Sequence, residues 1–74
     1  MEKLKTEKKY SNMNKIKKLR TEKSLTQEEL ARISEIKLST LQKLERVDAN
    51  LEKMQLGTAV KLAKGLEIKI EELI

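Results

Sequence analysis

Residues 25–46, LTQEELARISEIKLSTLQKLER, decide the fold. The apolar side chains of this stretch are those of Leu30, Ile36, Leu41 and Leu44. Their spacing is the one required by two short helices that cross each other closely. Ala31, a small residue within this pattern, lets the second helix approach where a larger residue would hold the two apart. The stretch therefore predicts a helix-turn-helix, two short helices joined by a tight turn.

The first helix of this pair has a well-marked start. Thr26 is placed as the N-cap, and Glu29, three residues later, completes a capping box in which each side chain accepts from the other residue's backbone N–H. Leu25 and Leu30 occupy the positions of a hydrophobic staple. These signals predict a helix over residues 27–34.

The second helix of the pair has two possible starts. A turn at 34–37 leads into a helix predicted over residues 38–46, for which Lys37 would be a poor N-cap. Ser39 followed by Gln42 matches a second capping box, which would begin the helix two residues later. In either case the outer face of this helix is polar and positively biased.

The composition excludes several classes of function. At 74 residues the chain has room for one domain, whose core supplies roughly 3–5 kcal/mol of net stability at this size. Because the chain has no cysteine and no histidine, disulfides, Cys/His zinc sites, thiol nucleophiles and imidazole bases are excluded. No combination of nucleophile, base and orienting group is visible, so we expect no enzyme, no cofactor and no metal. No apolar run reaches the roughly 18–20 residues of a membrane span, so we expect a cytoplasmic protein without a membrane partner.

The charge is that of a protein that approaches phosphates. The 17 Lys and Arg residues outnumber the 12 Asp and Glu residues, so the formal net charge is +5 and the sequence pI is about 9.6. The polar face of the 38–46 helix also adjoins the capped start of the 27–34 helix, whose N–H groups and dipole favour a phosphate. These features predict DNA binding. The alternatives are a lysine-rich composition that serves solubility and a polar face that meets only water.

The N-terminal residues differ in character from the rest of the chain. Residues 1–12, MEKLKTEKKYSN, carry four lysines and two glutamates with few bulky apolar groups. We predict a flexible basic arm, followed by a domain over residues 13–74. The arm either follows DNA phosphates or a minor groove, or is a frayed leader. Asn14 is placed to cap a helix over residues 15–23.

The C-terminal part adds two helices to the prediction. Residues 47–54 are typical of a connecting loop, with Leu51 and Met54 beneath it. Helical spacing then runs through Leu56, Ala59, Val60, Ala63 and Leu66, and a short last helix follows around Ile68, Ile70 and Leu73. Gly65 lies inside this pattern, where it is able to end the helix early. The prediction is an all-α fold of five helices.

The chain resembles the phage repressor and Cro-like (Xre) helix-turn-helix family. The resemblance runs from Ile16 to the C-terminus, over IKKLRTEKSLTQEELARISEIKLSTLQKLER and TAVKLAKGLEIKIEELI. Its most specific elements are LTQEELA, STLQKLER and KLAK with the terminal EEL. It implies a compact lambda-repressor-like domain whose second and third helices form the motif. It also implies a sequence-specific transcription regulator that inserts the 38–46 helix into the major groove of double-stranded DNA.

The resemblance implies roles for twelve residues. Five stand where relatives touch base edges: Lys37, Leu38, Ser39, Gln42 and Lys43. Gln pairs with adenine, Lys donates to guanine, Ser is adaptable and Leu meets a thymine methyl group. Five others are candidates for phosphate contacts, which set the register without reading sequence: Thr26, Gln27, Thr40, Arg46 and Asn50. In relatives, the glutamine that matches Gln27 also braces the start of the recognition helix. Arg20 and Glu45 match two residues that pair with each other inside the domain, so we assign them a structural role.

Four positions depart from the family pattern. Relatives often have glycine where this chain has Ser24, Glu35, Val47 and Glu67. Each site either forces a bulky residue into the left-handed conformation, at a cost of order 1 kcal/mol, or has a reshaped turn with shifted helix boundaries.

We expect a repressor that blocks polymerase and binds a palindromic operator as a symmetric homodimer. Relatives dimerise around the last helix, where this chain has more apolar surface than one short helix needs: Leu66, Ile68, Ile70, Leu73 and Ile74. Core packing within one subunit explains the same residues equally well. Two alternative functions stay open: an antitoxin that binds its own promoter and a toxin, and a module that binds a protein through the basic face.

Overall fold

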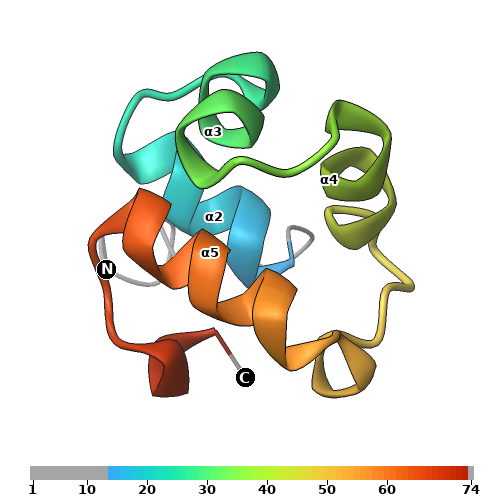
Figure 1. Cartoon of the computed structure of the whole chain (residues 1–74). Helices are drawn as coiled ribbons and strands as arrows, with labels where there is room; N and C mark the ends of the chain where they lie inside the picture. Colours follow the sequence, from blue (N-terminus) through green and yellow to red (C-terminus); the bar gives the residue numbers. More distant parts are fainter. Residues whose placement is uncertain (1–13, 74) are drawn as a thin grey trace, which may run out of the picture.

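The computed structural model describes residues 14–73, which form a helical domain (Figure 1). Its elements in chain order are α2 (Lys15–Glu22), α3 (Gln27–Ser34), α4 (Leu38–Leu44), the 3-10 turn η1 (Leu51–Lys53), α5 (Leu56–Leu66) and the 3-10 turn η2 (Ile70–Glu72). Over residues 14–73 there is no strand, and the all-α class is confirmed. The count of five helices is corrected, because the last predicted helix is the single turn η2. The arm predicted at 1–12 and Ile74 lie outside the described residues.

Helices α2 and α3 begin at the predicted caps. The Asn14 side-chain oxygen accepts from the backbone N–H of Lys17 at 2.9 Å. Thr26 and Glu29 form the capping box, with the Glu29 carboxylate accepting from the Thr26 N–H at 2.8 Å and the Thr26 hydroxyl oxygen accepting from the Glu29 N–H at 3.0 Å. Because these local bonds satisfy N–H groups that have no partner within the helix, they fix where each helix starts.

A left-handed residue that is not glycine follows three of the helices, directly after α3 and α5 and one residue beyond the C-cap of α2. Ser24, Glu35 and Glu67 each have φ 58°, whereas Val47 does not have a positive φ. The left-handed residue after α3 lets the N–H of Ile36 reach the carbonyl of Ala31 at 3.0 Å, the long-range bond of a Schellman motif. Of the two alternatives for the family's glycine positions, the left-handed residue is therefore the one found at three of the four sites.

Helix α4 begins at the first of its two predicted starts and ends early. Lys37 is its N-cap and makes no side-chain capping bond, so the alternative start at Ser39 is wrong. The helix ends at Leu44 rather than at residue 46, and Glu45 is its C-cap. Figure 1 shows α4 at one side of the molecule, reached from α3 by an extended turn and followed by the long connection that contains η1.

The core is built from aliphatic side chains of every α-helix. Five of them, and Leu73 just after η2, have no exposed surface: Ile16, Leu30, Leu41, Leu62, Leu66 and Leu73. Three buried alanines, Ala31, Ala59 and Ala63, add little bulk and allow helices to pack closely. The residues predicted beneath the connecting loop, Leu51 and Met54, pack against this core, as do Ile68 and Ile70. The core cluster of the described residues contains no aromatic side chain.

Burial corrects part of the predicted dimer surface. Leu66 and Leu73 have no exposed area, so they present no surface to a second subunit, and core packing accounts for them. Ile68 and Ile70 are only half-buried.

Gly65 serves packing rather than helix termination. Helix α5 continues through it to Leu66, so the predicted early end is wrong. A Cβ at this position would lie 2.1 Å from the hydroxyl oxygen of Ser34 on α3. Glycine therefore permits the close approach of α5 to α3. None of the helices formed by residues 14–73 has the length and apolar character of a membrane-spanning segment.

Candidate DNA interface

The outer face of α4 presents the polar side chains that the sequence singled out. Lys37, Ser39, Gln42 and Lys43 are exposed, so all four are accessible to a partner. Leu38 is half-buried and packs against the core, which leaves only part of its side chain for an outside contact. The structure thus brings the five predicted base-contact residues together along one short helix and its cap.

A buried network holds the C-terminal end of this helix. The guanidinium of Arg20 on α2 donates two hydrogen bonds to the Glu45 carboxylate, at 2.7 Å and 2.9 Å, and a third to the carbonyl of Leu25 at 2.7 Å. The two charged side chains are 13% and 2% exposed. Such a pair fixes geometry, because either charge left alone in this environment would be strongly unfavourable. The Arg20–Glu45 pair is therefore part of the domain's interior.

Gln27 takes part in the same network. Its amide nitrogen donates to the Glu45 carboxylate at 3.1 Å. The contact joins the start of α3 to the end of α4, and not to the start of the recognition helix as the resemblance implied. A phosphate contact by the Gln27 side chain would use the second N–H of the amide, because the first is already engaged.

Asn14 makes a contact that no sequence pattern predicts. Its amide nitrogen donates to the backbone carbonyls of Leu44 and of Arg46, the second at 3.2 Å. Its role as the cap of α2 was predicted from local sequence. The bond to α4 spans 30 residues along the chain, and no local pattern signals it.

The residues after α4 include two further phosphate candidates. Arg46 is exposed, and its Nε lies 3.5 Å from an exposed Asp48 carboxylate oxygen. A pair this open to water contributes little, so the guanidinium remains available for another anion. The Asn50 side-chain oxygen accepts from the N–H of Glu52 at 3.1 Å, which leaves its amide N–H groups to donate. Thr40, on α4 itself, is half-buried.

Electrostatics at the start of α3 are less favourable to a phosphate than its dipole alone suggests. Glu28 and Glu29 both lie in the first turn. The backbone and side-chain hydrogen bonds from Thr26 lower the pKa of Glu29 below its ordinary value. Two carboxylates therefore oppose the positive helix end.

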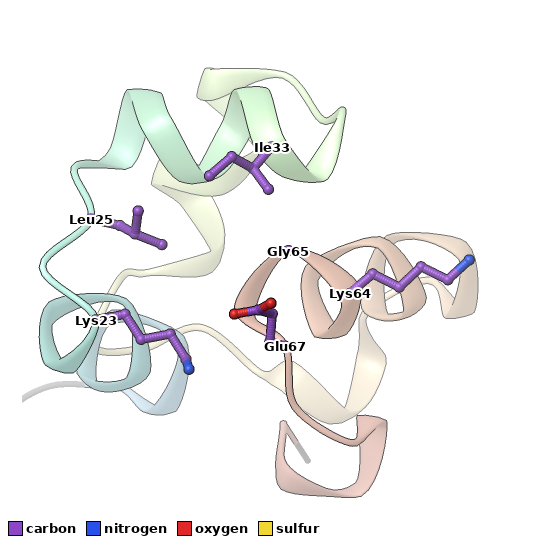
Figure 2. Close-up of a pocket in the computed structure, with 6 residues that line it drawn as sticks. All are labelled: Lys23, Leu25, Ile33, Lys64, Gly65 and Glu67. Carbon is purple, nitrogen blue, oxygen red and sulfur yellow. The ribbon is translucent and has the colours of Figure 1, made fainter.

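A shallow depression of about 550 Å³ lies between other elements (Figure 2). Its lining residues come from the ends of α2, α3 and α5 and include none from α4: Lys23, Leu25, Ile33, Lys64, Gly65 and Glu67. In Figure 2 Glu67 lies between the two lysines, and the Lys64 side chain extends away from it. Over residues 14–73 no group of three or more acidic, His or Cys side chains is placed to hold a metal ion.

Residues 15–74 match the family model of Cro/C1-type helix-turn-helix DNA-binding domains, and the chain belongs to this family. Among solved structures, it is similar to the restriction-modification controller protein C.AhdI from Aeromonas hydrophila. The two share 37% sequence identity, the match covers 81% of this chain and 86% of that one, and the TM-score is 0.71. A comparison with curated proteins found no match. The family and the fold class predicted from the sequence are therefore confirmed.

Proposed function

We propose that this protein is a sequence-specific transcription regulator that inserts α4 into the major groove of double-stranded DNA. The observation that carries the proposal is the exposure of four hydrogen-bonding side chains along one helix, held from behind by the buried Arg20–Glu45 pair. A rigid helix with an exposed polar face fits the major groove and meets base edges there. The net charge of +5 favours approach to the phosphate backbone.

Each base-contact candidate has a chemical role in this proposal. Gln42 forms a bidentate pair with adenine, and Lys37 and Lys43 donate to guanine. Ser39 adapts to either partner, and the exposed part of Leu38 meets a thymine methyl group. The phosphate contacts come from Thr26, Gln27, Thr40, Arg46 and Asn50, which set the register of α4 without reading the sequence.

We further propose that the protein represses transcription by occluding polymerase, as a homodimer on a palindromic operator. Two copies of α4 would then read half-sites about 34 Å apart along the DNA. Ile68 and Ile70, half-buried beside η2, remain as the candidate dimer surface, together with Ile74. The basic residues 1–12 would add phosphate contacts beside the domain. Since its partner is chromosomal or phage DNA, the protein works in the cytoplasm.

Binding to DNA from upstream of the protein's own gene tests the proposal. Fluorescence anisotropy at several salt concentrations should give a log–log slope of roughly −5 if six phosphates are contacted. Replacing Gln42 and Lys43 by alanine should relax base preference while the domain stays folded. Lys61→Ala, at an exposed lysine on α5, is the matched control and should keep the base preference. Equal affinity of the unmodified protein for scrambled DNA at physiological salt would refute sequence-specific binding.

The similarity to C.AhdI supports a second, narrower candidate function: control of a restriction-modification system. The genes beside the one for this chain separate the candidates. Genes for a DNA methyltransferase and an endonuclease would favour the controller. A gene for a small toxin would favour the antitoxin alternative, in which the same domain binds its own promoter and a protein partner.

A further inference from the structure

One side chain closes two helix ends that are far apart in the sequence. The oxygen of the Asn14 amide accepts from the N–H of Lys17 and caps the start of α2. The nitrogen of the same amide donates to the carbonyls of Leu44 and Arg46. An amide of this kind has two N–H donors and one carbonyl oxygen, so all three groups are engaged.

This contact lies at the point where α4 ends, two residues before the end that its sequence pattern predicts. In a continuing helix the carbonyl of Leu44 would accept from the N–H of residue 48. In the structure it accepts from Asn14 instead, and α4 ends at Leu44. The chain then tightens into turns, with the N–H of Ala49 donating to the carbonyl of Arg46 at 3.0 Å.

We propose that Asn14 is a positioning residue for DNA binding: it terminates the recognition helix and fixes the segment that follows. This inference rests on the proposed function. The Arg46 carbonyl is anchored to the start of α2, so the base of the Arg46 side chain has a defined place relative to the rest of the domain. Phosphate contacts depend on such placement, because they set the register of a protein on the duplex.

The contact is separable from the buried ion pair. Glu45 is held through its carboxylate by Arg20 and Gln27, whereas the bonds from Asn14 go to the backbone carbonyls of the residues on either side of Glu45. Loss of the Asn14 bonds therefore leaves the ion pair in place. The expected change is local, at the end of α4 and in the turn after it.

Two variants distinguish positioning from capping. Asn14→Ser keeps an N-cap of comparable strength and adds no charge, but its hydroxyl is too short to reach α4 while it caps α2. Asn14→Ala loses both functions. Hydrogen exchange should be faster, by about fivefold or more, at the amides of Glu45 and Arg46 in both variants. The amide of Lys17 should exchange faster only in Asn14→Ala. Unchanged exchange at Glu45 and Arg46 in Asn14→Ser would overturn the proposal, and this measurement requires no DNA.

The second measurement uses the upstream DNA, at a temperature where Asn14→Ser is fully folded. We expect its affinity to fall by roughly five- to tenfold and its salt slope to fall by about 1, with the order of preference among base-substituted duplexes unchanged. Gln42→Ala should do the reverse and change preference without changing the slope. If the unmodified protein discriminates between upstream and scrambled DNA and Asn14→Ser binds with the same affinity and slope, the positioning role is wrong. If the unmodified protein does not discriminate, the proposed function itself fails.

Discussion

Gly65 on α5 and Ser34 on α3 lie so close that a Cβ at position 65 would be 2.1 Å from the Ser34 hydroxyl oxygen. Gly65→Ala should therefore destabilise the domain by about 1–3 kcal/mol, because the Ser34 side chain must turn away or the two helices must separate to accept the methyl group. The matched control is Gly57→Ala at the start of the same helix, where a Cβ meets nothing within 4 Å. Gly57→Ala should stabilise the domain by up to about 1 kcal/mol, because alanine has a higher helix propensity than glycine. Urea unfolding measures both, and a gain in stability from Gly65→Ala would contradict the packing argument.

The hydroxyl of Ser34 has no hydrogen-bond partner although the residue is only 2% exposed. Ser34→Ala should therefore raise the free energy of unfolding by about 1 kcal/mol. The substitution removes a buried hydroxyl group that loses its hydrogen bonds to water on folding and gains none within the protein. It should also reduce the damage caused by Gly65→Ala when the two are combined, since the closest atom is gone. Denaturant midpoints of the single and double variants test this. A loss of stability in Ser34→Ala would mean that the hydroxyl is bonded.

Left-handed glutamates at two helix ends offer a route to higher stability. Glu35→Gly and Glu67→Gly should each raise the free energy of unfolding by about 1 kcal/mol, since glycine adopts this conformation without a Cβ clash. Val47→Gly is the control from the same set of family glycine positions, and it should give no gain because Val47 has no positive φ. Thermal melts followed by circular dichroism provide the comparison. Equal effects at all three positions would point away from backbone conformation.

The Arg20–Glu45 pair should carry much of the domain's stability. Arg20→Ala leaves the nearly inaccessible Glu45 carboxylate without its main partner, and we expect a loss of about 3–5 kcal/mol. Arg46→Ala removes one side of an exposed pair and should change stability by no more than about 0.5 kcal/mol. Far-ultraviolet circular dichroism during urea titration separates the two. Similar midpoints for both variants would show that the buried pair is not the structural anchor described above.

The capping box of α3 should give stability a dependence on acid pH. The hydrogen bonds from Thr26 lower the pKa of Glu29 from its ordinary value of 4.5. A carboxyl group whose pKa is lower in the folded protein stabilises the fold above its unfolded pKa, and this contribution disappears as the pH falls through the folded pKa. The melting temperature of Glu29→Gln should thus lie below that of the unmodified protein at neutral pH and approach it in acid. A difference that is constant with pH would exclude this linkage.

Local signals in the sequence predicted the parts of the fold that local interactions determine. The capping box at Thr26 and Glu29 fixed the start of α3, and the expected left-handed residues appear at Ser24, Glu35 and Glu67. Both depend on backbone groups within a few residues of each other. The exposed face of α4 also followed from helical spacing, because its apolar positions left a single polar side.

Contacts between distant segments account for what the sequence did not predict. Asn14 binds the carbonyl at the end of α4, Gln27 binds Glu45, and Gly65 lies against Ser34. Periodicity identifies apolar residues but does not say whether they meet their own core or a second subunit. For that reason Leu66 and Leu73 fitted a dimer surface as well as they fitted the core in which they lie.

The aliphatic core leaves the domain without an optical reporter of its own. The chain contains no Trp and no Phe, and its one Tyr, Tyr10, lies outside the described residues. An indole introduced by Val47→Trp, at a site that is 80% exposed just beyond α4, would be the only one in the chain and could be excited at wavelengths that Tyr10 does not absorb. Its fluorescence would follow the arrival of DNA in real time, and association rates would be measurable without a dye.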